Sequence, residues 1–325
     1  MKEMNMIEAL NQCMHQLFAS DDRIVTFGED CGFFGGVFRV TTGLQEKFGN
    51  GRCFDTPLSE RGIVGTAVGM AIKGLKPICE VQFADYIFPA YEQIQNEICK
   101  IRYRSASAFT CPLVIRTPYG GGIHGGLYHS QSPEAQFLHM PGLHVVVPSD
   151  PYEAKGLLRS AVESNDPVLF LEPKRIYRAI KAMVPEEEYN IPLGQAQVAV
   201  EGSDITLIGW GAQHHQNLKA AKSLKDKHGI EVEVINLRSL NPLDYKTPVC
   251  SVQKTGRCVI AHEAPKTMGF GAELSSLITE HCFYSLETPI ARCCGLDTPF
   301  PHTLEKQYLP EANRVEQMLI ETLRS

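Results

Sequence analysis

The sequence predicts an α/β protein built from two consecutive doubly wound domains. Short apolar runs alternate with helical stretches along most of the chain, and this alternation stops after residue 171 and restarts at residue 204. The apolar runs favour largely parallel sheets covered by helices. At roughly 100–200 residues per domain, a length of 325 residues also favours two domains. We therefore predict a first domain over residues 1–185, a linker over 186–203 and a second domain over 204–325.

The elements of the first domain follow from local patterns. Apolar residues at helical spacing predict an opening helix around residues 7–18. Strands are expected over 23–27, 77–83, 112–116, 143–147 and 167–171, with a helix over 86–104. Asp150 is a good helix N-cap and Pro151 suits the first helical position, so a further helix is expected from there to about residue 164.

The second domain repeats the alternation of strands and helices after a segment of different composition. Residues 172–203 contain three prolines, an acidic triplet and little periodicity, which is typical of a crossing between domains. Strands are expected over 204–211, 231–240, 257–264 and 289–295, with helices over 212–228, after the strand at 257–264, and over 312–323. Gly229 follows the first of these helices as a left-handed cap.

Composition excludes several classes of protein. The chain has 31 basic and 37 acidic residues and no long basic run, which argues against nucleic-acid binding. No apolar stretch reaches the roughly 18–20 residues that span a membrane. The N-terminal residues resemble neither a signal peptide nor a transit peptide. Eleven scattered cysteines without a C-x-x-C motif fit a reducing cytosol or matrix, and each is expected to be buried.

The first candidate motif is DTPLSERGIVG, residues 55–65. Ser59 or Thr56 can cap a helix whose first turn contains Glu60, and the positive end of the helix dipole favours the ionised form of this glutamate. Three glycines share one face of the same helix, at positions 62, 65 and 69. Glycine costs roughly 0.5–1 kcal/mol in a helix relative to alanine, so another backbone is expected close to this face. A first-turn glutamate is also common on helices that bind nothing.

Two more motifs place polar side chains where ligands gather. Gln82, Asp85 and Tyr86 follow a predicted strand, and ligands of open α/β sheets bind outside the carboxyl ends of strands. Aromatic residues there can equally complete the core. A loop with five glycines over 120–126 then delivers His124 and His129 to the start of a helix, and histidine is the usual proton-transfer residue near neutral pH. Either histidine could instead bond only to the backbone.

Two further patterns carry little weight. Gly269-Phe-Gly271 follows a strand like the start of a dinucleotide-binding fingerprint, but Leu274 stands where the third glycine belongs. His214 and His215 are adjacent on a helix and do not share a face, which argues against a metal site.

Together the motifs resemble the β subunits of thiamine-diphosphate-dependent 2-oxo acid dehydrogenases. The resemblance rests on DTPLSERGIVG, QFADY (82–86), HSQSPE (129–134), PGL (141–143) and GLDTPFP (295–301), in this order. The stretches QFADYIFPA and GLYHSQSPEA look most like the branched-chain form. The resemblance implies a pyrimidine-binding domain followed by a transketolase C-terminal-like domain.

This resemblance also implies roles for individual residues. Glu60 would bond the aminopyrimidine ring nitrogen of the cofactor, Tyr86 would lie beside that ring, and Gln82 and Leu58 would be pocket neighbours. His129 would lie at a channel mouth and help to pass the acyl group to a lipoyl arm.

Metal ions follow from the same resemblance. No Gly-Asp-Gly segment exists here to hold Mg²⁺ and the diphosphate, so both are expected on the α subunit. Some family members bind a structural K⁺ near segments equivalent to residues 113–114 and 161–166. Ala161 and Ser164 replace a cysteine and an aspartate of that pattern.

The implied activity is the oxidative decarboxylation of branched-chain 2-oxo acids, in branched-chain amino acid catabolism. The partners would be an α subunit, in a heterotetramer of two α and two β chains, and the lipoyl acyltransferase core of a multienzyme complex. The location would be the bacterial cytoplasm, or the mitochondrial matrix if a transit peptide was removed. A pyruvate or acetoin dehydrogenase β subunit, a self-sufficient transketolase-like transferase and a non-catalytic scaffold are the alternatives.

Overall fold

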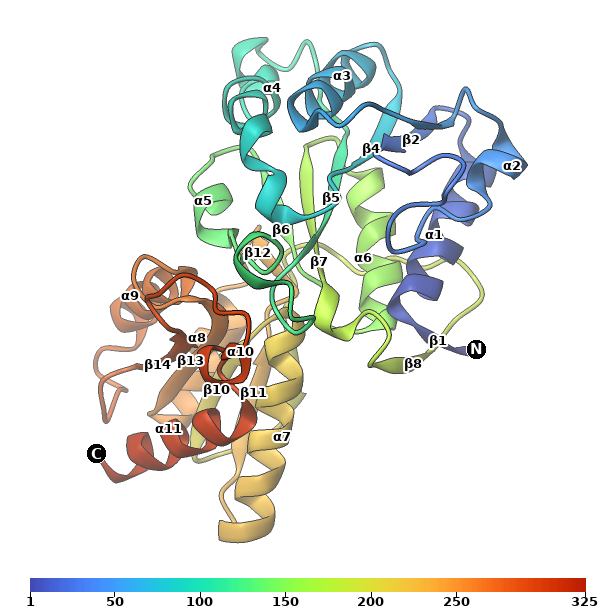
Figure 1. The fold of residues 1–325 in the computed structure, drawn as a ribbon. Coiled ribbons are helices and arrows are strands. Elements are labelled where there is room, and N and C mark those ends of the chain that lie inside the picture. The colour runs from blue at the N-terminus through green and yellow to red at the C-terminus, as the bar shows by residue number, and fades with distance from the viewer. The chain divides into compact units, whose positions relative to one another are not determined.

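The computed structural model describes residues 1–325 and divides into two compact units. The first unit contains residues 1–119 and 136–193, and the second contains residues 120–135 and 194–325. Each unit has a mainly parallel sheet with helices packed on it (Figure 1). The chain is therefore an α/β protein, as the sequence predicts.

In the first unit the strands follow the order β6-β7-β5-β4-β2-β3, and each neighbouring pair is parallel. A separate antiparallel pair joins β1 to β8. The strands are β1 (Lys2–Asn5), β2 (Ile24–Gly28), β3 (Cys53–Asp55), β4 (Lys76–Glu80), β5 (Val114–Tyr119), β6 (His144–Val146), β7 (Val168–Pro173) and β8 (Lys181–Val184).

The helices of the first unit begin at recognisable caps. Asn5 forms a capping box with Glu8 at the start of α1, and the Asp150 side chain accepts the Glu153 N–H at 2.7 Å at the start of α6. Helices α1 and α6 pack side by side (Figure 1). The helices are α1 (Met6–Ser20), α2 (Leu44–Phe48), α3 (Glu60–Ile72), α4 (Ile101–Arg104), α5 (Glu134–Leu138) and α6 (Pro151–Glu163).

The single helix predicted over residues 86–104 is wrong. The segment contains the 3-10 turns Ala84–Tyr86 and Phe88–Ala90, a π-helix at Gln93–Ile98 and the short α4. Pro89 lies inside the second turn and has no N–H to continue an α-helical ladder. Its position explains why the helical pattern of the sequence breaks here.

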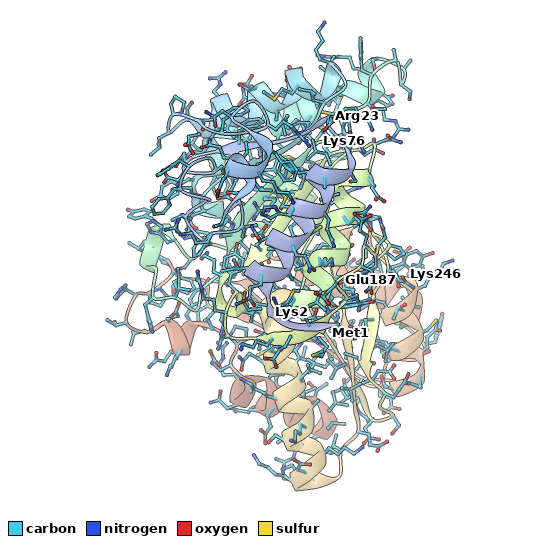
Figure 2. The ribbon with its side chains drawn as sticks, turned by 90° about the vertical axis from the view of Figure 1, so that its right-hand side faces the viewer. Met1, Lys2, Arg23, Lys76, Glu187 and Lys246 are labelled. Carbon is cyan, nitrogen blue, oxygen red and sulfur yellow. The ribbon has the colours of Figure 1, made fainter.

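Ion pairs fix the amino ends of two central strands. Arg23 precedes β2 and Lys76 begins β4, and the two lie close together (Figure 2). Both pair with the Asp21 carboxylate, at 2.8 and 3.5 Å. Such partly exposed pairs stabilise by about 1 kcal/mol or less. They tie together the edge of the sheet opposite to the one where the polar motifs lie.

The second unit has the strand order β14-β13-β10-β11-β9, parallel except for the β9–β11 pair. The bounds are β9 (Gln197–Val200), β10 (Ile205–Gly209), β11 (Val232–Asn236), β12 (Ser239–Asn241), β13 (Cys258–Pro265), β14 (Ala291–Gly295), α7 (Gly211–His228), α8 (Lys246–Thr255), α9 (Phe270–Cys282), α10 (Glu305–Tyr308) and α11 (Ala312–Arg324). Gly229 caps α7 with φ 70°, as predicted.

Helices cover both faces of this second sheet. Leu207 of β10 belongs to a core cluster with residues of α7 and α11. The neighbouring Thr206 hydroxyl instead contacts Ser251 and Thr255 of α8, at 2.7 and 2.8 Å. Because successive strand residues face opposite sides, α8 lies on the other face, which is the doubly wound arrangement.

Connections between the sheets differ in detail from the predicted linker. Strand β9 falls inside residues 186–203 and pairs with β11, while Lys155 donates to the carbonyls of Pro185 and Glu187 at 2.6 and 2.9 Å. Residues 120–135 group with the second unit. The predicted domain limits of 1–185 and 204–325 stay a prediction.

Two other expectations concern the whole chain. All eleven cysteines are free thiols and ten are buried; Cys250, on α8, is exposed and differs from the expectation. Every helix is too short or too polar to cross a lipid bilayer.

Candidate functional site

The N-terminus of α3 carries the first predicted site residue. The Ser59 hydroxyl accepts the Gly62 N–H at 3.3 Å and so caps the helix, and Glu60 is the first helical residue. Glu60 is half-buried, whereas the Leu58 side chain is 79% exposed. Glu60 therefore presents a carboxylate at the mouth of a helix, beside an aliphatic side chain that this chain leaves uncovered.

A second carboxylate, Glu29, lies close to Glu60 and was not among the predicted residues. Glu29 follows β2 directly, is 8% exposed, and its Oε1 atom has no hydrogen-bond partner. Burial, followed by the negative charge of Glu60, raises the pKa of Glu29 above its ordinary value. Neither carboxylate has a cation within ion-pair distance, so this edge of the sheet is rich in acceptors.

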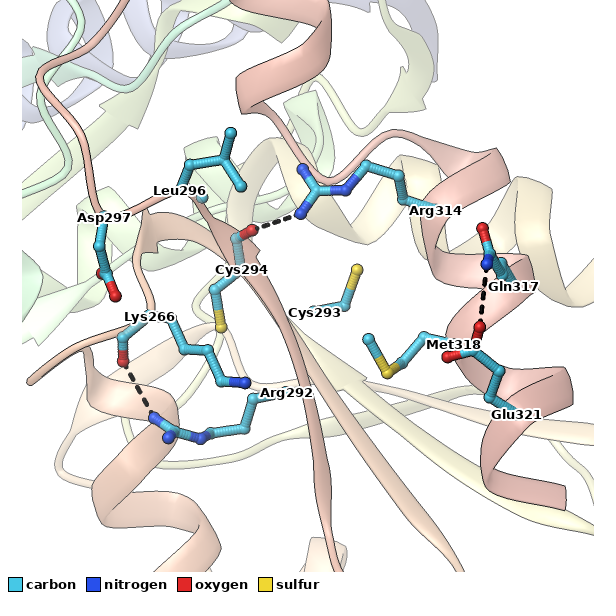
Figure 3. Close-up of a pocket in the computed structure, with 11 residues that line it drawn as sticks. Lys266, Arg292, Cys293, Cys294, Leu296, Asp297, Arg314, Gln317, Met318 and Glu321 are labelled. Carbon is cyan, nitrogen blue, oxygen red and sulfur yellow. Dashed lines mark hydrogen bonds between the residues drawn. The ribbon is translucent and has the colours of Figure 1, made fainter. Parts of the chain in front are cut away.

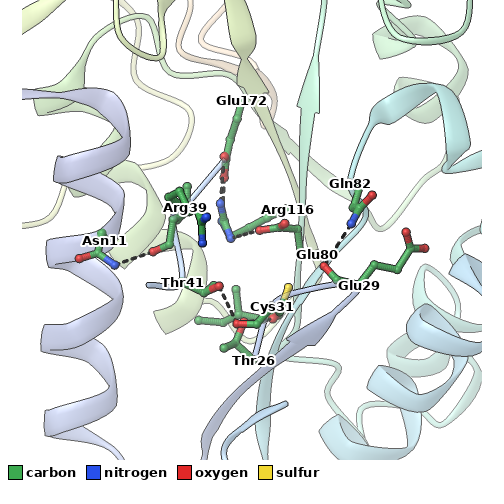
Figure 4. Close-up of polar contacts among 12 residues, drawn as sticks. Asn11, Thr26, Glu29, Cys31, Arg39, Thr41, Glu80, Gln82, Arg116 and Glu172 are labelled. Carbon is green, nitrogen blue, oxygen red and sulfur yellow. Dashed lines mark hydrogen bonds and ion pairs between the residues drawn. The ribbon is translucent and has the colours of Figure 1, made fainter. Parts of the chain in front are cut away.

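Gln82 joins the loops that follow two neighbouring strands. Its side-chain amide donates to Asp30 Oδ2 at 3.0 Å and to the Glu29 carbonyl at 3.4 Å (Figure 4). Strands β2 and β4 are adjacent and parallel, so their carboxyl ends meet here. The structure thus brings Gln82 and Glu29 together at the predicted edge of the sheet.

Tyr86 ends the 3-10 turn that follows β4 and remains 39% exposed. Its ring contacts Phe83 edge-on, with 6.5 Å between ring centroids. An exposed aromatic face at the carboxyl edge of a sheet can stack on a flat heterocycle. Most of the side chain is covered by neighbours, so core packing stays the alternative interpretation of this residue.

A cavity of about 350 Å³ adjoins the N-terminal half of α3. Phe27 and Phe54, whose rings stack at 5.1 Å, form an apolar wall, and Asp55, Ser59 and Gly62 provide polar edges. The side chain of Asp55 also accepts the Gly32 N–H at 2.6 Å, which holds the loop after β2. This volume is within the range of small-molecule sites.

A buried network of ion pairs fixes the strands that end at the same edge of the sheet. Arg116 donates to both oxygens of Glu172, at 2.7 and 2.9 Å, and to Glu80 at 2.8 Å, and all three side chains are at most 5% exposed (Figure 4). The Tyr177 hydroxyl donates to Glu172 at 2.5 Å. Glu80 ends β4, so the network fixes the strand from which Gln82 and Tyr86 emerge.

The glycine-rich loop is held by glutamates from distant segments of its own unit. Glu263 accepts the Gly121 N–H at 3.1 Å, and Glu305 accepts the N–H groups of Gly122 and His124 at 2.6 and 3.3 Å. His124 Nδ1 also lies 3.1 Å from Glu305 Oε2. The loop is therefore anchored at several points, although its glycine content suggests flexibility.

His129 lies at the end of this loop, in the second compact unit. His129 is half-buried. A Cβ added to Gly125 would lie 2.8 Å from the Cβ and from the carbonyl oxygen of His129, so the loop packs tightly against this histidine. Glu134 begins α5 shortly afterwards and accepts a bond from Trp210 Nε1 at 3.1 Å. Burial raises the pKa of Glu134 to about 7.

The weaker sequence patterns have packing roles. A Cβ at Gly269 or Gly271 would lie 2.7 Å from the buried His262 ring, so these glycines make room for a side chain. His214 is 6% exposed, and burial lowers its pKa to about 3. The structure contains no group of three or more His, Cys, Asp or Glu side chains arranged to hold a metal. No backbone of this chain approaches Gly65 or Gly69.

Comparisons with known proteins match these observations. A model of the transketolase pyrimidine-binding domain matches residues 2–180, and a model of the transketolase C-terminal domain matches residues 194–315. The mitochondrial 2-oxoisovalerate dehydrogenase subunit beta of Dictyostelium discoideum is 55% identical over 311 residues, which covers 95% of this chain and 84% of that protein. The chain belongs to the β-subunit family of the 2-oxo acid dehydrogenases. This confirms the family and the two domain types that the motifs predict.

Other relatives of this β subunit are somewhat more distant. The pyruvate dehydrogenase E1 component subunit beta of Staphylococcus epidermidis is 45% identical over 324 residues, which covers 99% of both chains. A solved structure described as a split gene transketolase, an inactive beta4 tetramer, superposes with a TM-score of 0.77 at 24% identity and covers 99% of this chain and 98% of that one. This last similarity supports the fold alone.

The family depends on thiamine diphosphate, and the residues of the first unit fit one end of that cofactor. An aminopyrimidine has an amino group that donates hydrogen bonds, a ring nitrogen that can share a proton with a carboxyl group, and a flat face for an aromatic ring. Glu60, the unpartnered Oε1 of Glu29 and the exposed ring of Tyr86 provide partners for these groups.

Proposed function

We propose that this β subunit acts with an α subunit, as two α and two β chains, in the oxidative decarboxylation of branched-chain 2-oxo acids. The observation that carries the substrate class is the greater similarity to a 2-oxoisovalerate dehydrogenase β subunit than to a pyruvate dehydrogenase β subunit. The acyl group would pass to lipoyl groups of an acyltransferase core. A pyruvate or acetoin dehydrogenase β subunit is the alternative.

In this proposal the chain's own residues position one end of the cofactor. Bound thiamine diphosphate supplies the electron sink for decarboxylation. Glu60 accepts a hydrogen bond from the pyrimidine ring and can hold that proton at its carboxylate. Tyr86 and Leu58 flank the ring with exposed aromatic and aliphatic surface, and Gln82 orients the loop that carries Glu29.

His129 is proposed to help pass the acyl group to a lipoyl arm. Its loop is held by Glu263 and Glu305, so the imidazole is presented on a fixed support. The side chain is half-buried, so part of the imidazole stays accessible to a group that approaches from solvent.

We assign Mg²⁺ and the diphosphate to the α subunit. The sequence lacks a Gly-Asp-Gly segment, and Glu60 and Glu29 are unpaired anions that would repel a diphosphate. A structural K⁺ near residues 161–166 stays a prediction, and the Asp166 carboxylate there is already paired with Arg102 at 2.6 Å. The relatives include bacterial and mitochondrial proteins, so we infer a bacterial cytoplasm or a mitochondrial matrix as the location.

A panel of 2-oxo acids tests the substrate class. The chain is reconstituted with its α subunit, and kcat/KM is measured for branched-chain acids and for pyruvate with an artificial electron acceptor. We expect the highest value on a branched-chain acid. The fastest turnover on pyruvate would overturn the choice and favour the alternative.

A conservative substitution tests the role of Glu60. Glu60→Gln preserves size and removes the charge, and we expect kcat to fall by about 10²–10⁴-fold with the assembly intact, because loss of a positioned acid or base costs this much. Glu92→Gln, which changes an exposed carboxylate paired with Arg61, is the control. Near-full activity of the Glu60 variant would instead support a non-catalytic scaffold.

A further inference from the structure

The second unit contains a pocket that the proposed function does not involve. It has a volume of about 330 Å³ and lies along β14, between the end of β13 and helix α11 (Figure 3). Lys266 follows β13, Leu296 and Asp297 follow β14, and Met318 projects from α11. Strand β14 is the edge of its sheet, so the pocket lies beside a strand with no further neighbour.

Two cations line this pocket without a carboxylate partner. Arg292 Nη1 donates to the Lys266 carbonyl at 3.0 Å, which fixes the guanidinium and leaves its remaining N–H groups without a partner in the chain (Figure 3). The Lys266 ammonium forms no ion pair within 4.0 Å. Both cations line the pocket and neither has a carboxylate within ion-pair distance, so together they favour a negatively charged ligand there.

The wall opposite these cations is rigid. Arg314 of α11 donates to the carbonyls of Gln307, Tyr308 and Leu309 at 2.9–3.2 Å and to the Cys294 carbonyl at 3.0 Å. These bonds connect α10, α11 and the end of β14. A pocket whose wall is fixed in this way needs little reorganisation to bind a ligand.

The two carboxylates of the pocket accept hydrogen bonds from uncharged groups. Asp297 accepts the Thr267 N–H and hydroxyl at 2.9 and 2.7 Å, and Glu321 accepts the Gln317 amide at 2.9 Å. Neither acid lies within 4.0 Å of the charged groups of Lys266 or Arg292, and the bonds from Thr267, with a smaller effect of the Lys266 charge, lower the pKa of Asp297. Together with Arg314, the pocket has three cations and two anions, and its field favours a negative ligand.

The positive charges of the pocket also act on the thiol of Cys294, at the floor of the pocket. Burial raises the pKa of the Cys294 thiol to about 12, and among the opposing influences are the positive charges of Arg292 and Lys266. The floor itself is apolar, since Cys293 is buried and contributes to the core cluster with α11. Leu296 and Met318 extend this apolar surface.

We propose that this pocket binds a small organic anion, with a carboxylate or phosphate group between Lys266 and Arg292 and a short apolar body against Leu296 and Met318. The volume is at the lower end of the range for ligand sites, which fits a small molecule. The site is independent of the cofactor edge of the first unit and of the activity proposed for it.

Calorimetric titration of the full chain tests the site with three probes at constant ionic strength. These are inorganic phosphate, isobutyrate and the uncharged isobutyramide, each up to about 10 mM, where a millimolar Kd is measurable. We expect binding of phosphate or of isobutyrate and none of isobutyramide. Stronger binding of phosphate points to a phosphate ester as the natural ligand, and stronger binding of isobutyrate to a short-chain acid.

Two double variants locate the binding. Lys266→Gln with Arg292→Gln is expected to weaken anion binding by about tenfold or more, because both charge-assisted contacts are lost. Lys219→Gln with Lys222→Gln, which removes two exposed charges from α7, is the matched control and should leave binding within about twofold. Binding of the amide as tight as that of the acid, an undiminished affinity in the first variant, or no binding of any probe overturns the proposal.

Discussion

Replacing Arg116 by methionine is expected to destabilise the first unit severely. Arg116 is 1% exposed and makes three charge-assisted hydrogen bonds, two to Glu172 and one to Glu80. Glu172 is 0% and Glu80 4% exposed, so the variant leaves two buried carboxylates without a cation. Breaking a buried ion pair by removing one partner costs about 3–5 kcal/mol, and we expect a loss in this range.

The loss should depend on pH with a definite sign. Burial already raises the pKa of Glu80 above its ordinary value, and without the arginine it must rise further. A carboxyl whose pKa is higher in the folded than in the unfolded state binds more protons when folded, so stability falls as pH rises between those two values. The variant should therefore recover part of its stability when the pH is lowered from neutral toward the ordinary carboxyl pKa.

Urea unfolding followed by far-UV circular dichroism measures this loss. The single tryptophan, Trp210, lies in the second unit, so its fluorescence follows that unit separately. Arg102→Met is the control, because its side chain is 44% exposed and its partner Asp166 33% exposed, and such pairs contribute about 1 kcal/mol or less. A loss from Arg116→Met no larger than that of the control would refute the reasoning.

A triple variant isolates the contribution of the stranded charges to the lost stability. Glu80→Gln with Glu172→Gln in the Arg116→Met background removes the stranded charges, and we expect it to recover most of the lost stability. No recovery would mean that packing around the guanidinium, and not charge, causes the loss.

Three further outcomes are expected. Glu305→Gln weakens the bonds to Gly122 and His124, so thermolysin should cleave the loop near Ile123 several times faster, and an unchanged rate would contradict the anchoring. His129→Ala should reduce acyl transfer to a lipoyl domain more than decarboxylation measured with an artificial acceptor, and equal losses would refute its proposed role. Trp210→Phe removes a donor that favours the ionised Glu134, so the pKa of Glu134 should rise above about 7 in a carbon-13 NMR titration, and a fall would contradict the assignment.

Much of the fold could be predicted because its determinants are local. The cap at Asp150, the cap at Ser59 and the left-handed Gly229 each depend on residues within one helical turn. Continuous apolar runs identify strands buried on both faces for the same reason. Pro89 is a local signal against one continuous helix over residues 86–104, because a proline has no N–H to donate.

The residues that sequence reasoning missed depend on distant contacts. Glu263 and Glu305 bond the glycine loop across 142 and 183 residues of chain, and nothing near them in sequence indicates this role. Glu29 left one usable signal, an acidic residue placed directly after a buried strand. Its proximity to Glu60 could not be predicted, because it depends on the pairing of β2 with β3 and on the turn into α3.

Four carboxylates lie at the carboxyl edge of the first sheet, and they bear on which subunit binds which part of the cofactor. Glu29, Glu60, Asp30 and Asp55 gather there, and no cation pairs with any of them. A ring with N–H donors relieves this excess of acceptors, whereas a diphosphate would add negative charge to it. The carboxylates therefore favour an arrangement in which the diphosphate and its Mg²⁺ lie away from this edge, on another chain. We therefore infer that the unpaired carboxylates, and not only the missing Gly-Asp-Gly segment, make this β subunit dependent on its partner.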